Sequence, residues 1–238
     1  MKDIEYLKKY LAPSKLEEGI KRLEKGEPVQ YIVGNVDFYG YNINVNKNVL
    51  IPRFETEELV NNSIKYIKKN FTNPNILEIG TGSGCISIVL KKELESCNII
   101  ATDISKKALK VAKNNAIEND ADIEFINTNI YDGINKKFDV IISNPPYISK
   151  DEEIMDIVYK NEPHLALFAD NNGLYFYDQI LKNAEKIIKN KFLICFEIGM
   201  NQADKIKDLA NKYLKDIEIT VKKDMQGRDR MIFIKNFE

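Results

Sequence analysis

The segment Asn144-Pro145-Pro146-Tyr147 follows the apolar run FDVIIS and offers a rigid set of hydrogen-bond acceptors. Two consecutive prolines fix the backbone φ angles and remove two N–H donors. The side-chain oxygen of Asn144 and the carbonyl oxygen of Pro145 remain as acceptors. They suit a planar amide or amino NH2 group, which has two hydrogens to donate and a delocalised lone pair. We therefore expect this segment to hold and activate such a nitrogen, with the ring of Tyr147 against the planar group.

A second segment that could take part in chemistry is the glycine-rich sequence GTGSG at 80–84. It lies between the apolar run NILEI and a helical stretch. Glycines let the backbone turn tightly and approach a ligand without a Cβ in the way. Asp103 ends the next apolar run about twenty residues later, where a carboxylate is placed to bind ribose hydroxyls. The segment thus favours a nucleoside cofactor, either NAD(P) or S-adenosylmethionine (SAM).

The glycine spacing helps to separate these two cofactors. The dinucleotide-binding pattern has a third glycine where this chain has Cys85, and the spacing here is Gly-x-Gly-x-Gly. This favours SAM, which has no pyrophosphate to hold. The SAM sulfonium already activates the methyl group for transfer, so no metal is required. We also expect Glu78, a carboxylate within an apolar strand, to support the cofactor or the loop.

The order of apolar and helical stretches predicts the fold. Two short helices separated by Pro13 come first, and Ser14 with Glu17 fits a capping box for the second. A β-hairpin at 36–51 and a helix at about 55–70 follow. From residue 75 onward apolar strands alternate with helices, which is typical of a parallel sheet covered on both faces. We predict an α/β fold with a mostly parallel sheet and one antiparallel strand near its edge.

Composition narrows the functional classes. The chain has 238 residues with 35 Lys plus Arg against 36 Asp plus Glu, a formal charge of −1, so nothing global attracts nucleic acid. No apolar stretch is long enough for a membrane span, and the charged N-terminus does not fit a secretory signal. A single histidine and scattered cysteines predict no metal site and no Ser-His-Asp mechanism. A cytoplasmic enzyme is the simplest interpretation.

Several longer motifs resemble the HemK/PrmC family of release-factor glutamine methyltransferases. They include EPVQYIVG at 27–34, VLIPRFETEELV at 49–60, SNPPYI at 143–148 and EPHLALFADNNGL at 162–174. The glycine loop and the NPPY segment occur in many amino-group methyltransferases. The motifs at 49–60 and 162–174 are much more particular to this family.

The resemblance implies a seven-stranded SAM-dependent methyltransferase (Rossmann-like) fold and a protein substrate. The methyl group would go from SAM to the side-chain amide nitrogen (N5) of the glutamine in the Gly-Gly-Gln motif of a peptide-chain release factor, leaving S-adenosylhomocysteine. Asn144, Pro145, Pro146 and Tyr147 would hold that glutamine. The residues expected at the cofactor are Gly80, Thr81, Gly82, Ser83, Gly84, Asp103, Asn129, Ile130 and Asn144, and those expected to support it are Arg53, Glu55, Thr56, Glu57 and Glu78.

Two departures from the family pattern stand out. Only about 26 residues precede EPVQYIVG, fewer than the longer helical region that engages the release factor in the family, so partner recognition is expected to differ. Phe54 replaces the second proline of the Ile-Pro-Arg-Pro-Glu-Thr motif. The expected organisation is a short helical segment at 1–34, a hairpin linker at 35–54 and a methyltransferase domain at 55–238.

Other interpretations stay open at this point. An adenine-N6 or other nucleic-acid amino methyltransferase faces the same chemical problem, but no basic face or recognition domain is visible. A regulator that binds SAM without catalysis is a third possibility, and a NAD-dependent oxidoreductase is a distant fourth. Arg53 has two competing roles, as cofactor support or as a structural ion pair that ties the hairpin to the main domain.

Overall fold

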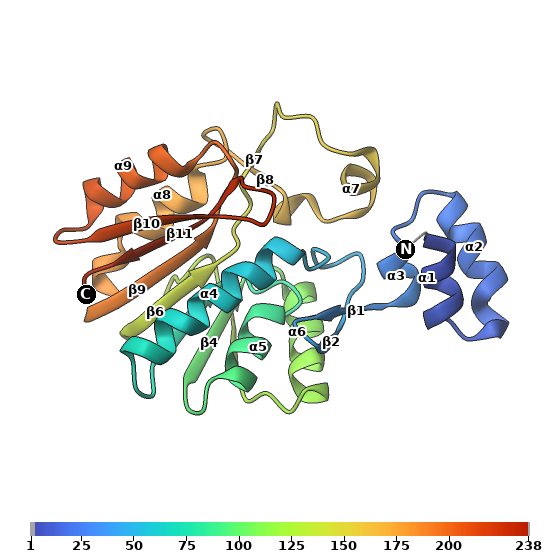
Figure 1. Ribbon diagram of the computed structural model, residues 1–238, viewed down its shortest axis with the longest axis horizontal. Coiled ribbons are helices and arrows are strands. Elements are labelled where there is room, and N and C mark those ends of the chain that lie inside the picture. The colour runs from blue at the N-terminus through green and yellow to red at the C-terminus, as the bar shows by residue number, and fades with distance from the viewer. Residues whose placement is uncertain (1–2, 238) are drawn as a thin grey trace.

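The computed structural model describes residues 3–237 and contains a seven-stranded sheet with helices on both faces (Figure 1). Residues 1 and 2 of the segment 1–34 and residue 238 of the segment 55–238 lie outside the described residues. The sheet order is β10-β11-β9-β6-β3-β4-β5. The strands are β3 (Asn75–Ile79), β4 (Asn98–Asp103), β5 (Glu124–Asn127), β6 (Phe138–Ser143), β9 (Ile188–Glu197), β10 (Glu218–Lys223) and β11 (Asp229–Lys235).

The strand directions confirm the predicted fold class. Neighbours from β9 through β6, β3 and β4 to β5 pair in parallel, whereas β11 pairs antiparallel with both β9 and β10. The loop between β10 and β11 is too short for a helical crossover, so the chain must reverse there. The reversed strand is therefore second from the edge of an otherwise parallel sheet.

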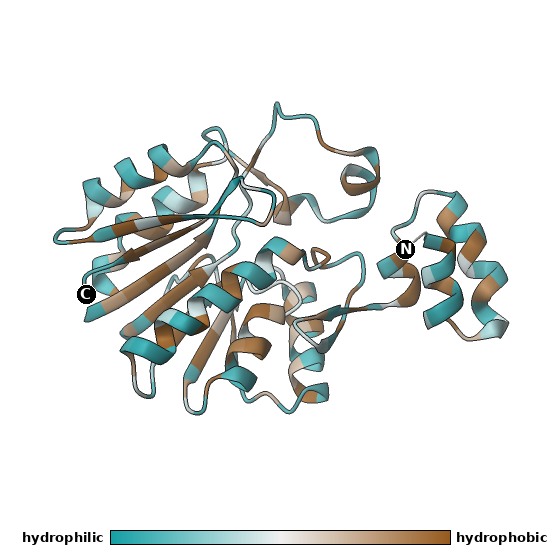
Figure 2. Ribbon diagram, viewed as in Figure 1, coloured by the Kyte–Doolittle hydropathy of each residue, from teal (hydrophilic) through white to brown (hydrophobic). Residues whose placement is uncertain are grey.

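Helices cover the sheet on two sides. One face packs against α4 (Phe54–Asn70), α5 (Cys85–Glu93) and α6 (Lys106–Glu118), and the other against α8 (Tyr175–Lys182) and α9 (Ala203–Tyr213). Because both faces are covered, the central strands are mostly apolar, as the brown strands in Figure 2 show. The helix predicted at about 55–70 is confirmed as α4, and its apolar residues Leu59, Val60, Ile64 and Ile67 are all buried.

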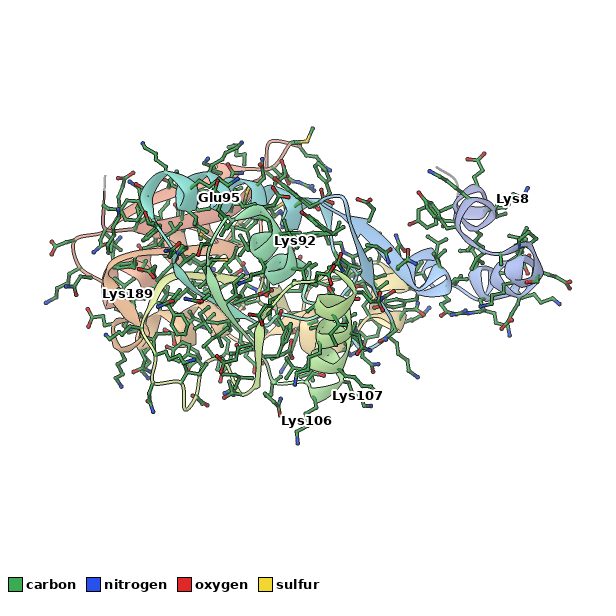
Figure 3. All side chains as sticks on the ribbon, turned by 90° about the horizontal axis from the view of Figure 1, so that it is seen from below. Lys8, Lys92, Glu95, Lys106, Lys107 and Lys189 are labelled. Carbon is green, nitrogen blue, oxygen red and sulfur yellow. The ribbon has the colours of Figure 1, made fainter. Side chains whose placement is uncertain are left out.

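The charged residues of these helices face outward. Figure 3 shows Lys106 and Lys107 extending away from the start of α6, and Lys8 doing the same on the N-terminal helices. On α6 the opposite side carries Ala108, Leu109 and other buried residues. This division of polar and apolar sides fixes how each helix lies on the sheet. No helix within residues 3–237 has the length and apolarity that crossing a bilayer requires.

The N-terminal residues form a small separate cluster of helices beside the main sheet (Figure 1). Its elements are α1 (Asp3–Tyr10), a 3-10 turn (Pro13–Lys15), α2 (Leu16–Glu24) and α3 (Val29–Val33). The capping box expected at Ser14 is wrong, because no side chain caps α2 and its N-cap residue is Lys15. The N–H of Leu16 bonds the carbonyl of Pro13, so Ser14 lies inside the turn that precedes the helix.

A two-stranded hairpin connects this cluster to the sheet. Its strands β1 (Asn35–Phe38) and β2 (Tyr41–Asn44) pair antiparallel around Tyr39 and Gly40, which both have positive φ angles. The hairpin lies where the sequence predicted one, but its second strand ends at Asn44, earlier than the predicted range 36–51. The remaining elements are α7 (Asp156–Asn161), the 3-10 turns His164–Ala166 and Ala184–Lys186, and two short strands. These strands, β7 (Ile148–Ser149) and β8 (Phe168–Ala169), pair with each other above the carboxyl edge of the sheet.

Asn115 joins the hairpin to the glycine-rich loop. This fully buried side chain of α6 donates from Nδ2 to the carbonyl oxygens of Asn44 (3.0 Å) and Ser83 (2.8 Å). Its Oδ1 accepts from the N–H of Asn44 at 2.9 Å. One side chain thus satisfies three backbone groups from two segments that are far apart in the sequence. Without it, these groups have to find other partners or remain unpaired.

We expect Asn115→Ala to lower the free energy of unfolding by about 2–3 kcal/mol, since backbone polar groups at a largely buried site lose their partner. Chemical denaturation followed by circular dichroism measures this change. Asn119→Ala is the matched control on the same helix, because its bonds to Asn42 and Asn115 are exposed or half-buried, and it should cost less than about 1 kcal/mol. Equal losses of unfolding free energy in both variants would show that the buried hydrogen bonds of Asn115 stabilise the fold no more than exposed ones.

Candidate active site

A pocket opens at the carboxyl edge of the sheet, where β3, β4 and β6 end. Ile79 of β3 pairs with Thr102 of β4 and with Ser143 of β6. The residues that follow these three strands therefore emerge side by side. The glycine loop and the Asn-Pro-Pro segment both line the resulting pocket, which has about 1120 Å³ of empty volume including its open mouth. Sites in open α/β sheets lie at this edge.

The glycine loop has the backbone that its sequence predicts. Gly80, Gly82 and Gly84 all have positive φ angles, between 55° and 85°. A Cβ at Gly80 or Gly82 would have no atom within 4 Å, so both face open space. Gly84 differs, because its Cβ would lie 3.1 Å from the Cβ of Ala112 on α6. The first two glycines thus leave room for a ligand, and the third lets α5 pack against α6.

Glu78 holds this loop from within. Its carboxylate is buried and accepts bonds from the Thr81 hydroxyl (2.7 Å) and from the N–H and hydroxyl of Ser87 on α5. Burial raises the pKa of Glu78 to about 7, although these hydrogen bonds act in the opposite direction. The carboxylate lines the pocket and joins the end of β3 to the start of α5. Loop support is thus visible directly in its contacts.

Asp103 and the segment 129–130 form the neighbouring wall. The carboxylate of Asp103 accepts the N–H of Gly82 (2.9 Å) and of Ser105 (2.8 Å), and burial raises its pKa. Ile130 has a φ angle of 54°, a conformation that a β-branched residue rarely adopts. The Thr102 hydroxyl donates to the carbonyl of Ile130 at 2.7 Å and holds it there. Such a maintained outlier is typical of a ligand-binding segment.

Asn144 is held in position by residues from two other elements. Its Nδ2 donates to the hydroxyl oxygen of Thr56 at 3.1 Å, and that hydroxyl donates to Glu197 at 2.6 Å. Thr56 lies in the first turn of α4 and Glu197 ends β9. Because the nitrogen of the Asn144 side chain is engaged, its oxygen remains for the pocket. The sequence predicted an acceptor at this position.

The other expected supporting residues lie outside the lining. The Arg53 guanidinium forms an ion pair with the buried carboxylate of Glu162, which also accepts the N–H of Ile51 at 3.1 Å. Glu55 lies 3.6 Å from Arg228. Of the two roles open for Arg53, the contacts support the structural ion pair, and the partner is the EPHLAL segment. Arg53 thus ties residues 162–167 to the linker that precedes α4.

Tyr147 and Gly84 also stand back from the pocket lining. The hydroxyl of Tyr147 lies 3.4 Å from both Glu197 and Arg230. Burial raises the pKa of Tyr147 above its usual value, so its hydroxyl stays protonated. The expected contact between its ring and a planar substrate group stays a prediction. The sequence-predicted residues that do line the pocket are Thr56, Glu78, Gly80, Thr81, Gly82, Ser83, Asp103, Asn129, Ile130, Asn144, Pro145 and Pro146.

Sequence reasoning missed part of the wall. Pro163, Leu165 and Ala166 close one side, and Phe176 lies on α8. The first three belong to the EPHLAL motif, whose likeness to the family was a usable signal, but nothing local marks Phe176. Within residues 3–237, no group of three or more His, Cys, Asp or Glu side chains is arranged to hold a metal ion.

Comparison with known proteins agrees with this geometry. Residues 59–167 match the model of the Methyltransferase small domain. A release factor glutamine methyltransferase of Flavobacterium psychrophilum is 45% identical over 218 residues, covering 89% of this chain and 76% of that relative. One of Lactococcus lactis is 43% identical, covering 92% and 82%. A methyltransferase structure from Pyrococcus furiosus has a TM-score of 0.61 at 20% identity, covering 83% and 89%.

The sheet order and the paired glycine and acceptor loops define a methyltransferase with an α/β fold. Sequence identity above 40% over most of both chains shows the family as well as the fold. The chain belongs to the release factor glutamine methyltransferase family, as its motifs indicated.

Glu162→Ala should loosen the segment that covers the pocket, because Arg53 and the N–H of Ile51 lose their shared partner. We expect amide hydrogen exchange in residues 148–167 to accelerate about tenfold or more. Hydrogen-exchange mass spectrometry measures this change. Asp156→Ala is the control, since it removes only an exposed ion pair with Lys160. Unchanged exchange in Glu162→Ala would contradict the role of this ion pair.

Proposed function

We propose that this chain transfers a methyl group from SAM to the side-chain amide nitrogen of the glutamine in the Gly-Gly-Gln motif of a peptide-chain release factor. The observation that carries the proposal is the shared pocket, which the glycine loop and the Asn144-Pro145-Pro146 segment line together. A methyl donor bound at the glycine loop would lie next to a substrate amide held by the Asn144-Pro145-Pro146 segment. The relatives from Flavobacterium psychrophilum and Lactococcus lactis, both release factor glutamine methyltransferases, supply the substrate class.

The pocket fits SAM on the features of this chain. The bare glycine backbone at 80 and 82 leaves space where a Cβ would point. The carboxylates of Glu78 and Asp103 line the pocket, which suits a cationic sulfonium. Asp103 keeps free lone pairs for ribose hydroxyls beside its two backbone bonds. The strained segment at 129–130 would contact the adenine.

Asn144 and Pro145 would hold the substrate amide. Each offers one carbonyl oxygen, and together they match the two hydrogens of a carboxamide NH2 group. Accepting both N–H bonds raises the electron density on nitrogen and fixes its orientation. Orientation of this kind contributes a large part of the acceleration in reactions between two bound groups. The proline-rich backbone supports this role because it is stiff before the substrate arrives.

SAM supplies an electrophilic methyl group on a sulfonium leaving group. The nitrogen would form the new N–C bond, the sulfur would keep the electron pair of the broken S–C bond in S-adenosylhomocysteine, and the lost amide proton would pass to solvent at the open mouth of the pocket. The apolar side chains along the pocket, which include Ile79, Ile86 and Ile180, would favour the dispersal of charge in this step. The partner would be a release factor in the cytoplasm. The division of the chain into segments 1–34, 35–54 and 55–238 is part of the same proposal.

One experiment tests this function directly. The protein is incubated with labelled SAM and a release factor, and the methyl group is mapped by mass spectrometry. We expect one methyl group on the Gly-Gly-Gln glutamine and none on a factor with that glutamine substituted. Label on another residue, or on nucleic acid alone, would refute the proposed substrate.

Two substitutions separate cofactor from substrate. Asn144→Ala should lower methylation by about 100-fold or more, because a reacting-group contact is lost, with SAM affinity nearly unchanged. Asp103→Ala should instead weaken SAM binding by about tenfold or more, by the loss of charged hydrogen bonds. Isothermal titration calorimetry and initial rates measure the two effects. Equal losses of both properties in Asn144→Ala would contradict its assignment.

A further inference from the structure

A chain of hydrogen bonds connects Asn144 to a buried carboxylate. Asn144 Nδ2 donates to Thr56 Oγ1 (3.1 Å), and Thr56 Oγ1 donates to Glu197 Oε2 (2.6 Å). Thr56 is 3% exposed and Glu197 is 2% exposed, so water does not compete for these bonds. The second distance is typical of a hydroxyl bound to an ionised carboxylate.

The single hydrogen of Thr56 makes this chain directional. An ionised Glu197 can only accept, so it takes the hydroxyl hydrogen of Thr56. Thr56 then has only lone pairs to offer to Asn144. The NH2 group of Asn144 must face Thr56, and its oxygen must face the pocket. The orientation of the Asn144 side-chain amide that a substrate NH2 group needs is thus set by Glu197, through the two hydrogen bonds that Thr56 makes.

We propose that Glu197, acting through Thr56, is a positioning residue that fixes the orientation of the Asn144 amide for the reacting nitrogen. This inference rests on the proposed function for the identity of the group that Asn144 meets. It assigns to Thr56 a role at the substrate side of the pocket rather than at the cofactor. It also gives Glu197, which lies outside the pocket lining, a part in the reaction without contact to substrate.

The surroundings of Glu197 hold it from several elements. Its second oxygen faces the hydroxyl of Tyr147 at 3.4 Å, and its backbone carbonyl accepts the buried hydroxyl of Tyr177 at 2.7 Å. The guanidinium of Arg230, on β11, bonds the next carbonyl, that of Ile198. Among charged groups, Arg230 favours the ionised form of Glu197, and Glu55 on α4 opposes it. The carboxylate is therefore held by groups from several elements, and of these two charges Arg230 has the larger effect on its pKa.

Protonation of Glu197 reverses the direction of the hydrogen bonds from Asn144 through Thr56 to Glu197. Burial raises its pKa to about 7, above the ordinary value for a glutamate. As the pH falls through this value, the neutral acid donates to Thr56, whose hydrogen then turns toward Asn144. Asn144 meets that hydrogen with its oxygen and presents NH2 to the pocket, where it opposes the substrate NH2. Turnover should therefore be full above pH 7 and decrease below it. Glu78 titrates in the same range, so the wild-type profile alone does not assign this decrease.

Substitutions test each link. Thr56→Val keeps the shape and removes the hydroxyl, and kcat for release-factor methylation should decrease about tenfold or more, with KM and SAM affinity within about twofold of wild type. Thr56→Ser restores the hydroxyl and should recover kcat to within about threefold. Glu197→Gln should remove the decrease below pH 7. Thr220→Val on β10 is the matched control for threonine substitution, with unchanged kinetics.

A measurement without substrate keeps the test independent of turnover. In 15N-labelled protein, the side-chain NH2 resonances of Asn144 are assigned by their absence in Asn144→Ala. They should shift as the pH passes through about 7 in the wild type, and show no such shift in Thr56→Val or Glu197→Gln.

The outcomes are distinct. Wild-type protein that fails to methylate a release factor refutes the proposed function, while the resonance titration still tests the hydrogen-bond chain. Normal kcat in Thr56→Val, or a pH-dependent decrease that persists in Glu197→Gln with its midpoint unchanged, overturns the inference. A loss of SAM affinity in Thr56→Val that matches its loss of kcat also overturns it, because Thr56 would then serve the cofactor.

Discussion

The parallel pairing of β3 with β6 is the constraint on which the site depends. Ile79 and Ser143 are the last paired residues, and the Ser143 hydroxyl donates to the Ile79 carbonyl at 2.7 Å. The glycine loop begins one residue after Ile79, and Asn144 follows Ser143. A shift of this register would move the two loops apart, and it would bury different side chains on each face. The sheet therefore sets the distance between donor and acceptor before any loop residue acts.

Two buried carboxylates transmit this order from the sheet to the loops. Glu78 lies near the end of β3 and holds Thr81 and Ser87, and Glu197 ends β9 and holds Thr56. Burying an ionised group is costly unless several donors satisfy it. That requirement makes each carboxylate an organising centre, because its donors must converge on it in the folded chain. In both cases one donor is a threonine hydroxyl that lines the pocket, Thr81 for Glu78 and Thr56 for Glu197.

The sequence predicted the features that depend on local rules. Alternating apolar and helical stretches indicated the sheet, and glycine and proline spacing located both loops, since these residues restrict or extend backbone freedom at their own positions. The role of Glu197 could not be found in this way, because its partner Thr56 is 141 residues away in the sequence and the two meet only through the fold. Asn115 is similar, as its partners Asn44 and Ser83 are distant in sequence. Phe176 reaches the pocket only through the packing of α8.

The two sides of the pocket differ in how firmly they are held, the proline segment more firmly than the side with Pro163 and Leu165. Behind the proline segment, Gln202 donates to the Tyr147 carbonyl at 2.9 Å, and Gly173 lies so close that a Cβ there would be 2.0 Å from the same oxygen. The opposite side, with Pro163 and Leu165, carries only the short 3-10 turn His164–Ala166 and is tied to the linker by the ion pair between Glu162 and a partly exposed Arg53. Under the proposed function, a glutamine carried by a protein would have to enter and leave, whereas the residues that hold it would have to stay in place. The fold thus gives rigidity to the acceptors and leaves the cover as the part that can move.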